Sequence, residues 1–129
     1  MAEHEKGFEI AFDAETSMLR LRLWGLWDTE VGQNLVWEFK KHVQNVSTMN
    51  TTWYVLADLT EFPPQFGEVQ QYLSEAMLLA KQHGMKKGAR IVANTITKMQ
   101  IARLSRETGV PESFFFQSEE AAIHWLLSE

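Results

Sequence analysis

A short apolar segment near the middle of the chain constrains the fold most strongly. Residues 53–58 read Trp-Tyr-Val-Leu-Ala-Asp, with no alternation of apolar and polar side chains. Such a run is typical of a strand covered on both faces, as in the parallel sheets of α/β proteins. Pro63 and Pro64 follow closely, and proline continues neither a helix nor a central strand. We therefore expect a central strand at 53–58.

Strand and helix patterns alternate along the rest of the chain. Apolar residues alternate with charged or small ones at 8–13 and 18–24, which predicts two half-buried strands joined as an antiparallel hairpin. Asp28 or Thr29 can cap the helix that follows, because their oxygens accept a hydrogen bond from a first-turn amide. The expected strands are 8–13, 18–24, 53–58, 89–94 and 114–116 (the last short and buried); the expected helices run from 29 to about 46, from 66 to 83, from a Thr97 cap to about 109, and from Ser118 onward, with a loop at 47–52.

This order of elements predicts the fold class, a single α/β domain. Its mixed sheet has about five strands, an N-terminal hairpin followed by parallel βαβ units, and the domain has four helices. Parallel neighbours need a crossover helix between them. A chain of 129 residues with 45% hydrophobic and 22% charged residues fits one domain. We expect that domain at 8–129 and a disordered N-terminus at 1–7.

Composition excludes several classes of protein and site. The chain has no cysteine, so it forms no disulfide and no thiolate metal site, and its four histidines lack zinc-type spacing. A net charge of −5 disfavours binding to nucleic acid. The sequence has neither an apolar run long enough to span a membrane nor a signal-peptide pattern at its start. We therefore expect a cytoplasmic protein without a transmembrane segment.

The charged residues are distributed unevenly. Residues 81–106 contain seven of the 12 Lys and Arg residues and none of the 17 Asp and Glu residues. Such a segment can bind an anionic ligand or an acidic partner. It can also be a solvated surface whose cations pair with acids elsewhere in the fold, and the sequence leaves both interpretations open.

Residues 55–60, the helix that follows them and the terminal segment 116–126 resemble a known family. The first segment reads Val-Leu-Ala-Asp-Leu-Thr and the last Phe-Gln-Ser-Glu-Glu-Ala-Ala-Ile-His-Trp-Leu. With the order of elements, they resemble the STAS domains, in particular the SpoIIAA-like branch grouped with STAS and Sec14-type folds, over residues 8–127. The resemblance implies a small cytosolic bacterial domain that is not an enzyme. It implies binding of an apolar or lipid-like ligand or of a partner protein, and we expect no cofactor.

The family's usual phosphorylation site is missing from this chain. Anti-sigma-factor antagonists of the wider family carry an Asp-Ser-Ser-Gly-type segment whose serine is phosphorylated to switch partner binding. The corresponding residues 62–68 read Phe-Pro-Pro-Gln-Phe-Gly-Glu, without Ser or Thr. The nearest hydroxyls, those of Thr60 and Ser74, do not match the motif. We therefore do not expect the usual phosphorylation switch.

Residues just past two expected strand ends form the candidate site. In α/β sheets, ligands favour the crevice outside the carboxyl ends of parallel strands. Phe62 and Phe66 would form an apolar wall there, and Asn94, Thr97 and Lys98 would hold a carboxylate or phosphate at a helix start. The sequence thus predicts a small apolar or amphipathic ligand at this place. The alternative is that these aromatic residues only close the end of the core.

Trp37 supports a different function. It lies off the expected buried stripe of its helix, formed by Val31, Leu35 and Phe39. An exposed tryptophan there would indicate a homodimer surface or a groove for a partner. The second hypothesis is therefore a regulatory protein-interaction module that acts through this helix.

Asp58 is the carboxylate best placed for catalysis, at the expected end of the central strand. The favoured interpretation is an Asx-type turn, in which Asp58 accepts a hydrogen bond from the amide of Thr60 or Glu61. The sequence contains no Gly-x-Ser-x-Gly motif and no phosphate-binding glycine loop. We therefore expect a binding protein rather than an enzyme.

Overall fold

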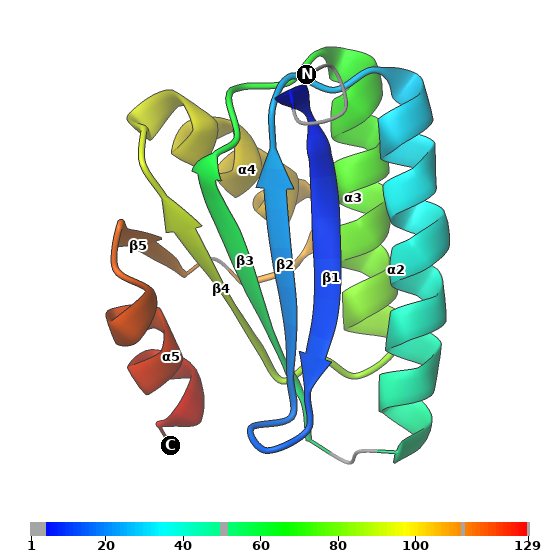
Figure 1. The fold of residues 1–129 in the computed structure, drawn as a ribbon, viewed down its shortest axis with the longest axis vertical. Coiled ribbons are helices and arrows are strands. Elements are labelled where there is room, and N and C mark those ends of the chain that lie inside the picture. Colours follow the sequence, from blue (N-terminus) through cyan, green and yellow to red (C-terminus); the bar gives the residue numbers. More distant parts are fainter. Residues whose placement is uncertain (1–4, 50–51, 112, 129) are drawn as a thin grey trace.

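The computed structural model describes residues 5–49, 52–111 and 113–128. One five-stranded sheet lies between a layer of three helices and a fourth helix on its other face (Figure 1). The elements follow in the predicted order, so the mixed α/β fold class is confirmed. The strands are β1 (Gly7–Asp13), β2 (Met18–Trp24), β3 (Tyr54–Glu61), β4 (Lys87–Val92) and β5 (Phe114–Phe116), and the helices are α2 (Thr29–Met49), α3 (Gly67–Gln82), α4 (Thr95–Thr108) and α5 (Glu119–Leu127).

The strands lie in the sheet in their order along the chain, β1-β2-β3-β4-β5. β1 and β2 form the predicted antiparallel hairpin, and the three following pairs are parallel. Helices α2, α3 and α4 are therefore crossover connections that all advance in one direction across the sheet. Because such connections are right-handed, all three lie on the same face (Figure 1).

The main core lies between the sheet and these three helices. β2 supplies Leu19, Leu21 and Leu23 to it, while Arg20 and Arg22 point to the opposite face. On that face, α5 buries Met18 at the start of β2 and its Glu119 pairs with Arg20. The described helices leave the rest of β2 open, so the strand keeps the alternation of apolar and charged residues seen in the sequence (Figure 1).

A smaller core lies under α5, which covers mainly β3, β4 and β5 and also buries Met18 at the start of β2. Ala122 and Leu126 of this helix pack with Leu56 and Ala89. On the other face of β3, Leu59 joins the main core. β3 is thus covered on both faces, which explains why its sequence does not alternate.

Two elements are longer than predicted. α2 continues to Met49 through residues predicted to form a loop. The hydroxyls of Ser47 and Thr48 donate to carbonyls of the preceding turn and so fit inside the helix. β3 continues past Asp58 to Glu61, because the polar residues at its end occupy the open face of the sheet.

The start of α4 and the place of β5 also differ from the predictions. Asn94, not Thr97, caps α4: its side-chain oxygen accepts a hydrogen bond from the Thr97 amide at 2.7 Å. β5 is an edge strand rather than a buried one, and Phe116 at its end is exposed.

The predicted disordered N-terminus, residues 1–7, overlaps the described chain only at 5–7, and residues 1–4 lie outside it. β1 begins at Gly7. Just before it, the ammonium of Lys6 lies 2.9 Å from the carboxylate of Asp28, the predicted helix cap. Asp28 also accepts a hydrogen bond from the amide of Val31 at 3.1 Å, as a cap of α2 does.

Candidate functional site

Gln65 is the polar centre of the sheet end at which β2, β3 and β4 finish. Its side chain is buried, with only 4% of the residue exposed. The side-chain oxygen accepts a hydrogen bond from the Trp27 amide at 2.8 Å. Its nitrogen donates to the carbonyls of Gly25 and Pro63 at 3.0 and 2.8 Å. One side chain therefore joins the loop after β2 to the loop after β3.

Helix α4 is attached to the same loop by two further side chains. Gln100 accepts a hydrogen bond from the Gln65 amide at 2.7 Å and donates to the Gln65 carbonyl at 3.0 Å. The hydroxyl of Thr97 donates to the Phe62 carbonyl at 2.7 Å. Gln65, Thr97 and Gln100, which we call the strand-end frame, thus hold together the loop after β2, the loop after β3 and helix α4. Satisfied buried polar networks of this kind make a region rigid.

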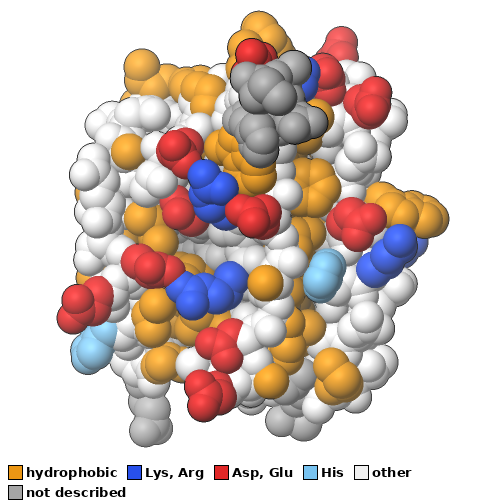
Figure 2. Space-filling view, viewed as in Figure 1, with side chains coloured by type: hydrophobic (Ala, Val, Ile, Leu, Met, Phe, Trp, Pro, Cys, Tyr) orange, Lys and Arg blue, Asp and Glu red, His pale blue; other side chains and the backbone are white. Residues whose placement is uncertain are grey.

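Large apolar side chains project outward around the strand-end frame. They come from the segments after β2, β3 and β4 and from the end of β5. Hydrophobic side chains gather along the upper left edge of the molecule in Figure 2, over the start of α4. Burying such side chains stabilises a complex, so exposed groups of them mark interaction sites. The strand-end surface consists of Leu26, Phe66, Ile96, Met99 and Phe116, all exposed.

The structure separates the two aromatic residues predicted to form a ligand wall. Phe62 is 1% exposed and packs edge-on against Trp27, with ring centroids 5.1 Å apart. Phe66, four residues later, is 64% exposed. A wall that uses both rings is therefore wrong: Phe62 belongs to the core, in line with the alternative interpretation, and only Phe66 is available to a partner.

The three polar residues predicted to bind an anionic head group also separate. Asn94 and Thr97 bond to each other at the start of α4, and Thr97 is buried. Lys98 remains at the surface, with its ammonium 5.3 Å from the centroid of the Phe116 ring and 5.8 Å from that of Phe114. The five predicted residues do not form one cavity, and ligand binding at this end stays a prediction.

The hollows near this end of the sheet are open rather than enclosed. One lies beside Trp27, Phe66 and Gly67 and has a volume of about 590 Å³. Another follows the outer side of α4 from Thr95 to Arg106, with a volume of about 660 Å³. Small-molecule sites usually enclose most of the ligand surface. Shallow hollows with protruding apolar side chains suit a macromolecular surface better.

Trp37 is exposed, as its position off the buried stripe predicts. It lies on the outer side of α2 with 63% of its surface accessible. The ammonium of Lys41, one turn further on, lies 4.9 Å from the centroid of its ring. Its role in a dimer or partner interface stays a prediction.

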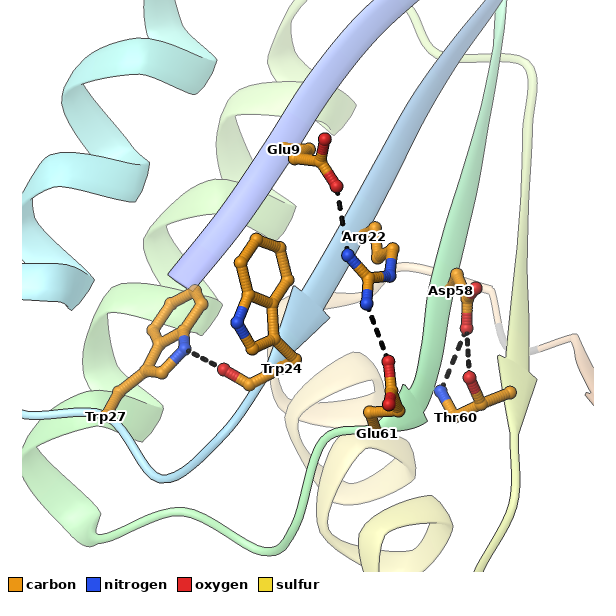
Figure 3. A network of polar contacts seen from close by, with 7 residues as sticks. All are labelled: Glu9, Arg22, Trp24, Trp27, Asp58, Thr60 and Glu61. Atoms are coloured by element: carbon orange, nitrogen blue, oxygen red, sulfur yellow. Dashed lines mark hydrogen bonds and ion pairs between the residues drawn. The ribbon is translucent and has the colours of Figure 1, made fainter. Parts of the chain in front are cut away.

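The open face of the hairpin carries a network of charges (Figure 3). Arg22 donates to Glu9 of β1 at 3.0 Å and to Glu61 of β3 at 2.7 Å, and its guanidinium lies 4.5 Å from the centroid of the Trp24 ring. The hydrogen bonds to Glu61 and Glu9 raise the pKa of Arg22 above its ordinary value. The network joins β1, β2 and β3 across the part of this face that α5 does not cover, which is a structural role.

Asp58 is occupied by its own strand. Its carboxylate accepts hydrogen bonds from the Thr60 amide at 3.0 Å and from the Thr60 hydroxyl at 2.7 Å (Figure 3). The predicted local bond is confirmed, although it lies within β3 rather than in a turn. In the part of the chain that the structure describes, no three His, Asp or Glu residues gather as metal ligands do.

The basic segment 81–106 does not form one site. Lys81 donates to the Thr108 carbonyl at 3.3 Å, and Lys87 donates to the carbonyls of Trp125 and Ser128 at 3.1 and 2.8 Å. These carbonyls end helices α4 and α5, where a cation is favoured by the helix dipole. These two lysines are thus bonded within the fold, but to backbone carbonyls rather than to the acids that the second interpretation of this segment predicted.

Gln65 and Gln100 were not singled out from the sequence. Glutamine is common at the protein surface, and the two residues stand 35 positions apart, so no motif connects them. The one sequence signal at this place is the pair of prolines at 63 and 64. It predicts an irregular loop but not the side chain that holds it.

The sheet carries three crossover helices on one face and a C-terminal helix on the other, and this arrangement matches the SpoIIAA-like fold of α/β domains. The fold is similar to that of an uncharacterized DUF3478-family protein with a SpoIIAA-like fold from Shewanella loihica PV-4, with a TM-score of 0.68, 18% identity and 98% of each chain covered. It is also similar to an anti-sigma factor antagonist from Mycobacterium paratuberculosis, with a TM-score of 0.63, 10% identity, and 95% of this chain and 96% of that chain covered. No family model and no curated protein matches the sequence. At these identities the likeness shows the SpoIIAA-like fold.

Proposed function

We propose that this chain is a non-catalytic regulatory module that binds a protein partner through its strand-end surface. The observation that carries the proposal is the exposure of Leu26, Phe66, Ile96, Met99 and Phe116 around one buried polar frame. The shared fold with an anti-sigma factor antagonist supports a protein as the partner. We place this function in the bacterial cytoplasm, as the sequence resemblance implies. None of the helices in the described residues is long and apolar enough to cross a membrane.

The strand-end frame favours binding because it is rigid before a partner arrives. Association costs free energy when loops and side chains must be ordered, and a surface that is already rigid avoids much of that cost. Gln65 and Gln100 hold the loops that carry Phe66 and Leu26 before any partner arrives. The free energy gained by burying these side chains, about 25 cal/mol per Å² of apolar area, is then available for affinity.

The basic residues beside this surface indicate the kind of partner. Lys98 lies next to Phe116, and Arg103 follows on the outer side of α4, where it pairs with Glu107 at 3.1 Å. On the side of α4, this apolar surface has cations at its margin and is complementary to an apolar partner surface with acidic residues at its edge, whereas beside Phe66 the margin carries Asp28 and Glu68. Because the loop at 62–68 has no Ser or Thr, we propose that phosphorylation of this loop does not control the binding.

The sequence predicts two other modes of binding. A small apolar or amphipathic ligand at the strand ends would need an enclosed site, and the hollows there are open. A homodimer through Trp37 would use a different surface, on the outer side of α2. The geometry supports a protein on the strand-end surface better than either.

The test is a comparison of two surface variants. Phe66→Ser with Met99→Ser removes two side chains of the strand-end surface, and Trp37→Ser with Leu78→Ser removes two exposed apolar side chains elsewhere. Each variant and the parent chain are cross-linked in cells. Each protein captured by the parent chain is then purified and its affinity measured by calorimetry.

We expect the partner to bind the parent chain and the Trp37/Leu78 variant alike, and to lose at least tenfold in affinity for the Phe66/Met99 variant. Thermal unfolding of all three proteins checks that the fold is intact. A partner that binds the Phe66/Met99 variant as well as it binds the parent chain would exclude this surface. Loss only in the Trp37/Leu78 variant would move the interface to the outer side of α2 and α3.

A further inference from the structure

A cavity of about 80 Å³ lies within the main core, between the sheet and helices α2, α3 and α4. Its walls include Leu21, Leu35, Phe39, Leu73 and Ala76. Protein interiors are close-packed, and a cavity of about 10–15 Å³ is already enough for one water molecule. This cavity is about half as large as an engineered apolar cavity that binds benzene. Its lining is apolar except for Arg90, so it suits a hydrocarbon group better than water.

A hollow on the surface meets this cavity near the amino end of β4. The hollow has a volume of about 480 Å³ and shares Met85, Gly88 and Val110 with the lining of the cavity. The sulfur of Met85 lies only 3.2 Å from the place that a Cβ on Gly88 would occupy, so the Met85 side chain packs directly against β4 at Gly88. Methionine is unbranched and adopts new rotamers easily. Met85 is therefore a movable side chain between the cavity and the hollow.

Basic side chains line the hollow. Lys81, Lys86 and Lys87 line it, and among the described residues no Asp or Glu does. Lys81 and Lys87 donate to carbonyls at the ends of α4 and α5, while Lys86 is exposed. Three ammonium groups in one concave region attract an anion. An apolar cavity behind a cationic entrance matches a molecule with a short hydrocarbon tail and an anionic head.

We propose that this is a binding site for a short-chain alkyl carboxylate, with the tail in the cavity and the carboxylate beside Lys86. Entry requires only that Met85 turns away from Gly88. The site lies at the amino ends of the strands, opposite the strand-end surface. The proposal therefore does not depend on the proposed partner binding, and either can fail without the other.

The test is a titration of the whole chain with sodium hexanoate, followed by NMR of its methyl groups. We expect saturable shifts at Met85 and at cavity methyls such as those of Leu35 and Ala76, and an affinity at least tenfold weaker for acetate, which lacks the tail. Ala76→Leu fills the cavity and should abolish the shifts. Ala121→Leu adds the same group to an exposed position of α5 and should leave the shifts unchanged.

A second variant tests the charged entrance without touching the core. Lys86→Gln should weaken hexanoate binding three- to tenfold and leave the binding of hexan-1-ol unchanged. Three results would overturn the proposal: no saturable shift at the cavity methyls, hexanoate binding retained in Ala76→Leu, or hexanoate binding unaffected by Lys86→Gln. Because Lys86 is exposed, its variant decides the matter even if Ala76→Leu does not fold.

Discussion

The two ends of the sheet satisfy their backbone polar groups by different chemistry. At the carboxyl ends of the strands, neutral side chains do so: Gln65, Gln100 and Thr97 bond to backbone groups of neighbouring loops. At the amino ends, cations do so: Lys81 and Lys87 donate to carbonyls at the ends of two helices. The exposed apolar side chains are concentrated at the neutral end, and the lysine-lined hollow lies at the charged end.

This difference bears on what each end can bind. A frame of neutral hydrogen bonds keeps its geometry when pH or salt changes, which suits a surface that must stay complementary to another protein. Lysine contacts with helix ends are partly electrostatic and weaken with salt. An entrance built from them can attract an anion and can rearrange when one binds. The predictions below test whether the two ends differ in the way that these contacts indicate.

The largest difference in the free energy of unfolding should be between variants of Phe62 and Phe66, the two phenylalanines in the loop after β3. Phe62→Ala removes a buried ring that packs against Trp27, and we expect it to lower the free energy of unfolding by about 3–5 kcal/mol. Phe66→Ala removes an exposed ring and should change it by less than about 0.5 kcal/mol. Urea unfolding of the two variants gives both values. Similar losses in both would mean that the separation of core and surface at this end is wrong.

The strand-end frame should show the next largest effect. Gln65→Leu leaves the amide of Trp27 and the carbonyls of Gly25 and Pro63 without their partner. Each buried unsatisfied group costs about 1–3 kcal/mol, and we expect a total loss of about 3 kcal/mol after relaxation. Gln71→Leu, at an exposed position of α3, is the matched control and should be close to neutral. A loss below about 1 kcal/mol for Gln65→Leu would show that the frame is not essential.

The contrast between Phe62 and Gln65 also shows how far sequence reasoning reaches. Periodicity predicts the strands, the helices and their order, because burial of one or both faces imposes a repeat on the residues. The Pro63-Pro64 loop has no repeat, so nothing local tells which of Phe62 and Phe66 points inward. The partner of Gln65 in α4 lies 35 residues away and is set by the packing of α4 beside the loop. That contact exists only once the fold is complete.

At the charged end, variants of two neighbouring lysines show whether contacts with a helix end contribute to stability. Lys87→Met removes hydrogen bonds to two carbonyls at the end of α5, and we expect a loss of about 1 kcal/mol in the free energy of unfolding. Lys86→Met, at the exposed position beside it, should leave the free energy nearly unchanged. Chemical unfolding at low and at high salt measures both. Equal losses for the two variants would contradict a specific role of Lys87 at the helix end.

The smallest effect concerns the ion pair between Lys6 and Asp28 at the carboxyl ends of the strands, where Arg22 and Glu61 form another. The hydrogen bond from Lys6, followed by that from the Val31 amide, lowers the pKa of Asp28 below its ordinary value of 3.8. Because the pKa is lower in the folded state, the contact stabilises the fold fully above that ordinary value, and the stabilisation is lost as pH falls through the folded pKa. In Lys6→Gln the pKa should rise towards 3.8 but stay below it, since the Val31 amide still donates. An NMR titration of the Asp28 carboxyl carbon measures the change, with Lys41→Gln as a control on the outer side of α2. An Asp28 pKa that does not move in Lys6→Gln would mean that the backbone amide alone sets it, and Asp28 would then be held by a neutral donor, as the loops joined by Gln65 are.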